Sequence, residues 1–149
     1  MGITVLTVGK EMIGGYGEMA DEYIKRISAF SKIQLKFIKD SGMLMDDKAS
    51  AVKQESDRIL KEAEKEKTVI LLDKSGEAMD SEKFSKLLDK NDICFIIGGS
   101  YGVDERVKKR AFKSVSFSKM TFPHRLFRVI LLEQIYRGYT IQKNMRYHK

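Results

Sequence analysis

The sequence is 149 residues long, with 42% hydrophobic and 33% charged side chains and a formal net charge of +7, and these values suit one globular domain with its own core. Apolar stretches such as Val69–Leu72 and Val129–Leu132 are far shorter than the roughly 20 residues that a membrane-spanning helix needs. We therefore predict one domain over residues 1–149 and no membrane partner.

Few residues suit covalent or metal chemistry. The single cysteine, Cys94, cannot form an intrachain disulfide, and its apolar neighbours predict a buried strand residue. His124 and His148 are not at metal-ligand spacing, so no metal site is expected. No basic segment precedes Ile3–Val8 and no small-residue cleavage site follows it, so we expect a cytoplasmic protein.

The positive charge is concentrated in the C-terminal third. Residues 106–149 contain 12 Lys and Arg and one acidic residue, Glu133, whereas residues 1–105 contain 16 Lys and Arg and 20 Asp and Glu. Basic surfaces of this kind bind phosphate backbones, because their side chains release condensed counterions. The alternative is a basic face that only keeps the protein in solution.

Strand and helix patterns alternate along the chain. Apolar runs rich in β-branched or aromatic residues predict strands at Ile3–Val8, Ile33–Ile38, Thr68–Leu72, Ile93–Ile97 and Ser114–Phe117. Helical periodicity and capping residues predict helices at Tyr16–Phe30, Ala49–Lys65, Lys83–Leu88, Glu105–Lys109 and His124–Tyr139. Asp40–Asp47 is the best candidate for a surface loop. We predict an α/β fold, with a mostly parallel sheet and helices on both faces.

The loops after Leu72, Ile97 and Phe117 could hold a ligand, since open parallel sheets bind ligands beyond the carboxyl ends of their strands. Gly98–Gly102 contains three glycines in five residues, which suits either a tight turn or a loop whose backbone approaches a cofactor. Phe117–Arg125 mixes hydroxyl, aromatic and thioether side chains. Met120 and Phe122 in this segment either fill the core beneath the last helix or line a pocket for an adenine and a methionine side chain.

The last helix and the tail suggest an assembly. Apolar residues cover most of the circumference of His124–Tyr139, and such a helix is buried on more than one side. We expect a homodimer through this helix, with a central helix in a monomer as the alternative. The terminal Tyr147 and His148 could stack on a base and titrate near neutrality, although tails of this composition are usually frayed.

Four ordered motifs resemble one known family. They are Phe95–Gly102, Ser116–His124, Glu133–Arg137 and Tyr147–Lys149, and Val8–Lys10 and Tyr23–Arg26 also fit. Together they resemble the family of ribosomal large-subunit RNA pseudouridine N3-methyltransferases, which belongs to the SPOUT class. The resemblance covers essentially the whole chain. The chain departs from the family pattern at Asn144–Arg146, where a small residue or proline usually precedes the Tyr-His pair.

The resemblance implies a SPOUT fold with a C-terminal trefoil knot and a bent S-adenosyl-L-methionine held in that knot. The implied cofactor-binding residues are Leu72, Gly98, Phe117, Ser118, Lys119, Met120, Thr121 and Phe122. It also implies a homodimer in which one subunit's tail completes the other's active site. The implied substrate is a pseudouridine of the 23S ribosomal RNA in the assembled ribosome.

The implied reaction assigns roles to three residues. N3 of pseudouridine is a weakly acidic imide nitrogen, so methyl transfer needs its proton removed and the nitrogen aligned. His148 is the candidate base, Tyr147 the stacking residue and Arg137 the phosphate contact. Two alternatives remain at this point: an RNA- or ribosome-binding factor without a cofactor, and a small-molecule α/β enzyme that uses a nucleotide.

Overall fold

A computed structural model describes residues 2–41 and 47–149 of the chain. Its strands form one parallel sheet in the order β2-β1-β4-β3-β5. The strands are β1 (Gly2–Val8), β2 (Lys32–Ile38), β3 (Thr68–Ala78), β4 (Ile93–Ile97) and β5 (Lys113–Ser116). The parallel α/β fold predicted from the sequence is thereby confirmed.

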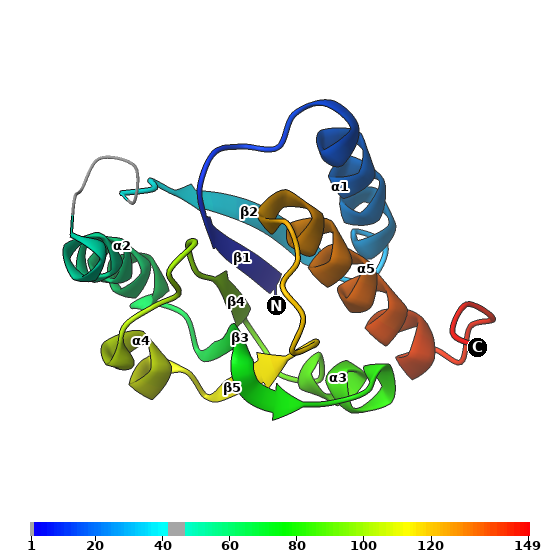
Figure 1. The fold of residues 1–149 in the computed structure, drawn as a ribbon. Coiled ribbons are helices and arrows are strands. Elements are labelled where there is room, and N and C mark those ends of the chain that lie inside the picture. The colour runs from blue at the N-terminus through cyan, green and yellow to red at the C-terminus, as the bar shows by residue number, and fades with distance from the viewer. Residues whose placement is uncertain (1, 42–46) are drawn as a thin grey trace.

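Helices cover both faces of the sheet, as Figure 1 shows. The helices are α1 (Gly14–Ile27), α2 (Lys48–Ala63), α3 (Ser81–Leu87), α4 (Glu105–Arg110) and α5 (His124–Gln142). The apolar side chains of α1, α3 and α5 share one cluster with the sheet, and those of α2 and α4 share another. Within the described ranges, no helix is long and apolar enough to span a membrane.

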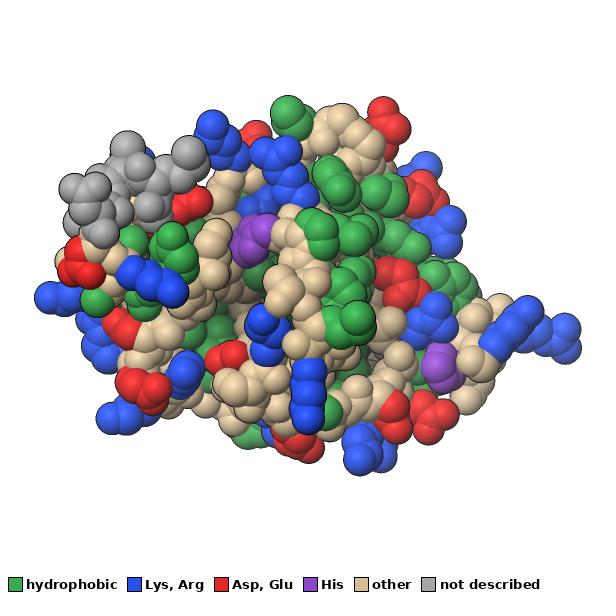
Figure 2. Space-filling model, viewed as in Figure 1, with side chains coloured by type: hydrophobic (Ala, Val, Ile, Leu, Met, Phe, Trp, Pro, Cys, Tyr) green, Lys and Arg blue, Asp and Glu red, His purple; other side chains and the backbone are tan. Residues whose placement is uncertain are grey.

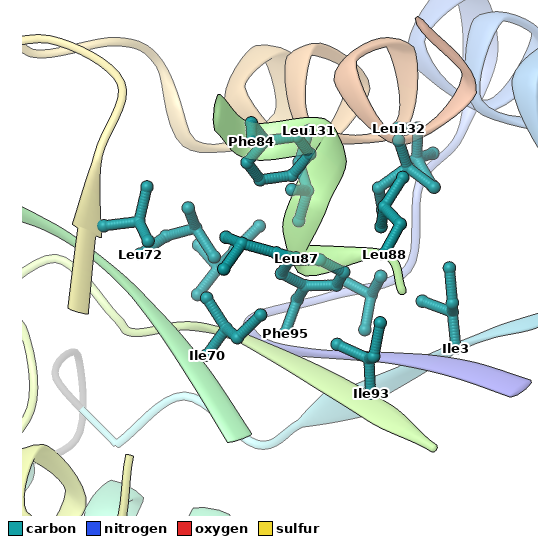
Figure 3. Close-up of a cluster of buried hydrophobic side chains, with 14 of the residues drawn as sticks. Ile3, Ile70, Leu72, Phe84, Leu87, Leu88, Ile93, Phe95, Leu131 and Leu132 are labelled. Carbon is teal, nitrogen blue, oxygen red and sulfur yellow. The ribbon is translucent and has the colours of Figure 1, made fainter. Parts of the chain in front are cut away.

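The two clusters follow from the alternation of side chains along each strand. In β1, Val5 points to the α5 side and Leu6 to the α2 side. The same alternation in β4 places Phe95 beneath Phe84 of α3, with ring centroids 5.7 Å apart. Figure 3 shows this cluster, in which side chains of α3 and α5 meet those of the central strands. Such two-sided burial explains why the central strands are almost continuously apolar.

Most predicted elements lie within a few residues of those observed, and their caps explain where they begin. The side chain of Asp80 accepts a hydrogen bond from the Lys83 amide, and that of Asp104 accepts one from the Arg106 amide. Asp47 caps α2 in the same way, while residues 42–46 of the predicted surface loop lie outside the described part. Cys94 is fully buried in β4, and burial raises its thiol pKa to about 12.

One strand is longer than predicted. β3 continues past Leu72 to Ala78, although residues after Leu72 are polar. Both Leu72 and Glu77 pair with Val115 of β5, so the intervening residues leave the regular ladder. Residues 73–76 therefore lie outside the regular pairing of β3 with β5. Irregularities of this kind are common near functional sites.

The final helix packs against its own subunit along much of its surface. Val129, Leu131, Leu132 and Ile135 are buried under α1, α3 and the sheet. Ile130, in contrast, is half-buried at the surface. In the helix expected to form the dimer, Leu131 therefore belongs to the subunit core, whereas Ile130 lies where a second chain can reach it.

We predict that Leu131→Ala lowers the free energy of unfolding by about 2–5 kcal/mol, because it leaves a cavity in the core. Met120→Ala is the matched control, since Met120 is 73% exposed, and should change that free energy by less than about 0.5 kcal/mol. Urea unfolding followed by circular dichroism measures both. A loss for Met120→Ala as large as that for Leu131→Ala would show that Met120 fills the core after all.

Candidate functional site

A cavity of about 390 Å³ lies beyond the carboxyl ends of β3, β4 and β5. The segments after neighbouring strands β3 and β4 lead to helices on opposite faces of the sheet, which opens a crevice between them. Residues 117–123 then cross this edge on their way from β5 to α5. The cavity is lined by Leu71, Leu72, Asp73, Lys74, Ile97, Gly98, Gly99, Ser100, Gly102, Val103, Val115, Phe117, Ser118, Met120, Thr121, Phe122, His124 and Phe127.

The lining combines apolar walls with polar groups held in place. The Lys74 ammonium donates to the Thr121 hydroxyl at 2.6 Å, which links the segment after β3 to the segment after β5. The Ser118 hydroxyl accepts from the Met120 amide at 3.0 Å, which stabilises the turn between them. Phe117 meets Phe84 edge-on with ring centroids 5.4 Å apart. A cavity with apolar walls and a few fixed polar groups is typical of a small-molecule site.

The glycine-rich segment forms one wall of the cavity and is a closed turn. The Gly102 amide donates to the Gly99 carbonyl at 3.0 Å, and Gly102 has a φ of +77°, which favours glycine. A Cβ atom on Gly98 would lie 2.9 Å from Cγ1 of Val103. The segment is thus both a tight turn and a cavity wall, and the two alternatives drawn from the sequence do not exclude each other.

The structure brings seven of the eight expected cofactor-binding residues to this cavity. Leu72, Gly98, Phe117, Ser118, Met120, Thr121 and Phe122 line it, whereas Lys119 does not and is exposed. Met120 is too exposed to fill the core, while the Phe122 ring is half-buried and stacks on Phe127 at 6.1 Å between centroids. Phe122 therefore both packs against the core and lines the cavity, whereas Met120 lines the cavity without filling the core.

Several lining residues were missed by the sequence argument. The loop after Leu72 was expected to face a ligand because it lies at the carboxyl edge of the sheet, but its lining residues Asp73 and Lys74 were not named. His124 was predicted to begin the last helix and to end a family motif, but it was not assigned to the cofactor site. Its Nε2 lies 2.8 Å from the Val8 carbonyl oxygen, so it joins the start of α5 to the end of β1.

The three expected catalytic residues also lie together, around Glu133 of α5. Arg137 donates to Oε1 of Glu133 through Nε at 2.9 Å and Nη2 at 2.7 Å. The Tyr147 hydroxyl donates to the same oxygen at 3.1 Å, and the Arg137 guanidinium stacks over the Tyr147 ring at 4.8 Å. Tyr147 and His148 are therefore half-buried and bonded to the helix, and the tail is not a frayed end.

The tail contacts define which groups can exchange a proton. Burial, and then hydrogen bonds with Tyr23 and Glu133, raise the pKa of Tyr147 above its usual value, so its hydroxyl stays protonated at neutral pH. The Arg137 guanidinium only donates, so His148 Nδ1 accepts in their 3.2 Å contact. A neutral His148 then carries its proton on Nε2, which lies 4.0 Å from Glu82. His148 must leave Arg137 before it can act as a base.

A second cavity, of about 500 Å³, lies between the tail and the first cavity. His148, Gln134 and Ser81 are among its lining residues, and it shares Phe117 and Phe122 with the first cavity. The Ser81 hydroxyl donates to the Gln134 side-chain oxygen at 2.7 Å across it. Phe117 and Phe122 therefore separate the first cavity from the second cavity, which the tail residue His148 lines.

The family to which the chain belongs follows from comparison with known proteins. A family model described as "Predicted SPOUT methyltransferase" matches residues 1–148. The chain is a member of the SPOUT methyltransferase family. The family resemblance drawn from the four sequence motifs is thereby confirmed.

Curated relatives of this SPOUT family member match it over its whole length. A protein of Mycoplasmopsis synoviae is 45% identical over 152 residues, covering 100% of both chains. One of Caldicellulosiruptor saccharolyticus is 42% identical over 156 residues, covering 99% of both. Each is named "Ribosomal RNA large subunit methyltransferase H".

Solved structures support the fold. A protein from Haemophilus influenzae Rd KW20, described as a probable methylase family protein, superposes with a TM-score of 0.59. The superposition covers 99% of this chain and 70% of that one, at 12% sequence identity. At this identity the likeness supports the fold alone. The trefoil threading implied by the resemblance stays a prediction.

We predict that Gly98→Ala lowers the free energy of unfolding by about 1–3 kcal/mol, because the new methyl group meets the Val103 side chain in a closed turn. Val103→Ala in the same protein should recover part of that loss by removing the atom in the way. Urea unfolding of the wild type, both single variants and the double variant gives the coupling, which we expect at about 1 kcal/mol. Strictly additive losses would contradict the contact.

Proposed function

We propose that this SPOUT family member is an S-adenosyl-L-methionine-dependent methyltransferase that methylates N3 of a pseudouridine in large-subunit ribosomal RNA. It acts as a homodimer on the assembled ribosome in the cytoplasm. The observation that carries the proposal is the match over the whole chain to proteins named ribosomal RNA large subunit methyltransferase H. Since the whole chain is matched, both the cavity and the tail fall within the similarity.

The first cavity suits S-adenosyl-L-methionine. Its volume of about 390 Å³ is within the usual range for small-molecule sites. Its lining includes aromatic and aliphatic side chains for the adenine and the methionine chain, with hydroxyls on Ser118 and Thr121. Leu72, Gly98 and residues 117–122 would hold the cofactor, with Lys119 contributing backbone groups only. When bound, the cofactor supplies an electrophilic methyl group on its sulfonium sulfur.

The remaining chemistry belongs to the chain's own side chains. The target N3 must lose its proton, and His148 is the candidate acceptor of that proton once its contact with Arg137 is broken. The Tyr147 hydroxyl stays neutral because its pKa is raised, and the Tyr147 ring can stack on a base. Arg137 is already bound to Glu133 on two nitrogens. In the subunit it therefore positions Tyr147 and His148, and a phosphate contact would draw on its remaining N–H groups.

The RNA-binding role is supported by the cationic C-terminal third. Lys119 and Arg125 are exposed beside the cavity-lining segment, and Lys74 lines the cavity itself. Figure 2 shows Lys and Arg side chains spread over the face that carries this edge of the sheet. Cations around the cavity can hold phosphates while the target base is aligned, because backbone contacts position a nucleic acid.

A homodimer is supported by the surface beside α5. In Figure 2 apolar side chains gather over α5 and the adjoining part of α1. Leu126 and Ile130 of α5 are half-buried there, and Met19 of α1 is 42% exposed. Apolar side chains that gather at one place on the surface are typical of an interface. In such a dimer the tail of each subunit completes the site of its partner.

We predict that the purified protein transfers methyl groups from labelled S-adenosyl-L-methionine to ribosomes that contain the unmethylated pseudouridine. Mass spectrometry of digested RNA should locate the methyl group at N3. Ribosomes with uridine in place of pseudouridine are the control for base specificity, and free large-subunit RNA is the control for the assembled substrate. Binding of ribosomes without cofactor binding or methyl transfer would instead identify an RNA-binding factor.

We predict that deleting residues 147–149 removes methyl transfer and preserves cofactor binding, because the first cavity contains no residue of the tail. A Gly98→Val chain has an altered wall in the first cavity and an intact tail. Mixing the two variants under conditions that exchange subunits should restore activity. The heterodimer then combines an intact cavity from one chain with an intact tail from the other. No recovery in a confirmed heterodimer would mean that each subunit uses its own tail.

A further inference from the structure

The start of α5 contains an imidazole of defined tautomer. His124 Nε2 lies 2.8 Å from the carbonyl oxygen of Val8. A carbonyl oxygen only accepts hydrogen bonds, so Nε2 carries the proton and donates it. In the neutral ring the other nitrogen, Nδ1, then has no proton and offers a lone pair. The contact with β1 thus decides which atom of His124 is an acceptor.

That acceptor is accessible. Among the described residues, Nδ1 of His124 has no hydrogen-bond partner, and no buried side-chain nitrogen or oxygen there lacks one. An Nδ1 without a partner must therefore be open to solvent or ligand. His124 lines the first cavity, together with Phe127 one turn further along α5. The neutral ring thus provides an acceptor nitrogen on a residue of the cavity wall.

A buried arginine keeps the same backbone in place. Arg128 is 2% exposed, and donates from Nε to the Thr7 hydroxyl at 2.7 Å, from Nη2 to the Val8 carbonyl at 2.9 Å and from Nη1 to the Lys10 carbonyl at 2.7 Å. Val8 thus accepts from both His124 and Arg128. Gly9 has a φ of +118°, and a Cβ atom there would lie 2.8 Å from Nη2 of Arg128.

The charges around His124 favour its neutral form. Arg128 lies one turn away on the same helix, the exposed Arg125 of α5 adds a second positive charge near Arg128, and Asp40 follows β2. Burial, followed by the Arg128 charge, lowers the pKa of His124 below its usual value, and the Val8 and Asp40 contributions in the opposite direction are smaller. Because the folded pKa is lowered, the acceptor form is fully present above the ordinary histidine pKa of about 6.5 and is lost only as the pH falls through the lower folded pKa.

We propose that His124 is a cofactor-recognition residue whose Nδ1 accepts a hydrogen bond from an N–H group of bound S-adenosyl-L-methionine, and that Arg128 is its positioning residue. This inference rests on the proposed function. The cofactor has two N–H groups of suitable chemistry, the adenine amino group and the ammonium of its methionine portion. Arg128 keeps the Val8 carbonyl in place and keeps the ring neutral, so that the same nitrogen always faces the ligand as an acceptor.

The sharpest variant is His124→Gln, because the glutamine amide nitrogen can replace Nε2 in its bond to Val8 while the acceptor at the position of Nδ1 is lost. Calorimetry at pH 7.5 should show S-adenosyl-L-methionine binding weakened about three- to tenfold, as expected for one hydrogen bond. Lys61→Gln is the control, since Lys61 is exposed on α2 and lines neither cavity, and should bind as the wild type does.

The pH dependence separates ligand recognition from a structural role. Wild-type affinity should decrease as the pH is lowered from 7.5 through the lowered pKa of His124, whereas His124→Gln should lack this decrease. Nitrogen NMR of the wild type should place the neutral-ring proton on Nε2. A His124→Gln protein with wild-type affinity and pH profile, or a neutral ring protonated on Nδ1, would overturn the inference.

Two ligands, S-adenosyl-L-methionine and methylthioadenosine, show which N–H group donates to His124. They also separate a failure of this inference from a failure of the proposed function. Methylthioadenosine retains the adenine amino group and lacks the ammonium. A loss of its affinity in His124→Gln would assign the adenine, and a loss confined to S-adenosyl-L-methionine would assign the ammonium. A wild type that binds neither probe would overturn the proposed function, and this inference with it. Normal wild-type binding that His124→Gln preserves would overturn the inference alone.

Discussion

Residues 117–123 carry the chain from the outer strand β5 back toward the middle of the sheet, where α5 begins beside the end of β1. The Arg128 guanidinium fixes this return by binding Thr7, Val8 and Lys10 at one point. A buried guanidinium without such acceptors would be very unfavourable, so these bonds favour the observed placement of α5. The segment before α5 is consequently held across the strand ends, where it forms a wall of the first cavity.

The first cavity then follows from the topology of the sheet. Because β3 and β4 are neighbours whose following helices lie on opposite faces, their loops separate at the strand ends. The extension of β3 and the closed turn of Gly98–Gly102 form two sides, and the crossing segment forms the third. The hydrogen bond between Lys74 and Thr121 joins two of these sides. The walls of the cavity therefore belong to segments whose course is set by distant elements, which suits recognition of a ligand of fixed shape.

The tail shows how one charge organises a cationic region. Glu133 is the single acidic residue of residues 106–149, and it binds both Arg137 and Tyr147. Its carboxylate offsets the local positive charge and holds the half-buried tail against α5. The Arg137 contact also occupies the His148 nitrogen that a base would need. In the isolated subunit the tail is therefore ordered but not arranged for proton transfer, which fits a site that a second chain completes.

The sequence by itself determined the parallel α/β fold, because alternating apolar runs and helical periodicity depend on neighbouring residues alone. Through the family motifs it also identified seven of the residues that line the cavity: Leu72 at the end of a strand, Gly98 in the glycine-rich turn and five in the mixed segment after β5. Only the tertiary structure showed the β3 extension. Its residues form a strand because they pair with β5, and no local pattern in the sequence predicts that pairing. The same holds for Arg128 and His124. Their partners, Thr7 and Val8, are more than a hundred residues away in the chain, and no local pattern reports contacts over such a separation.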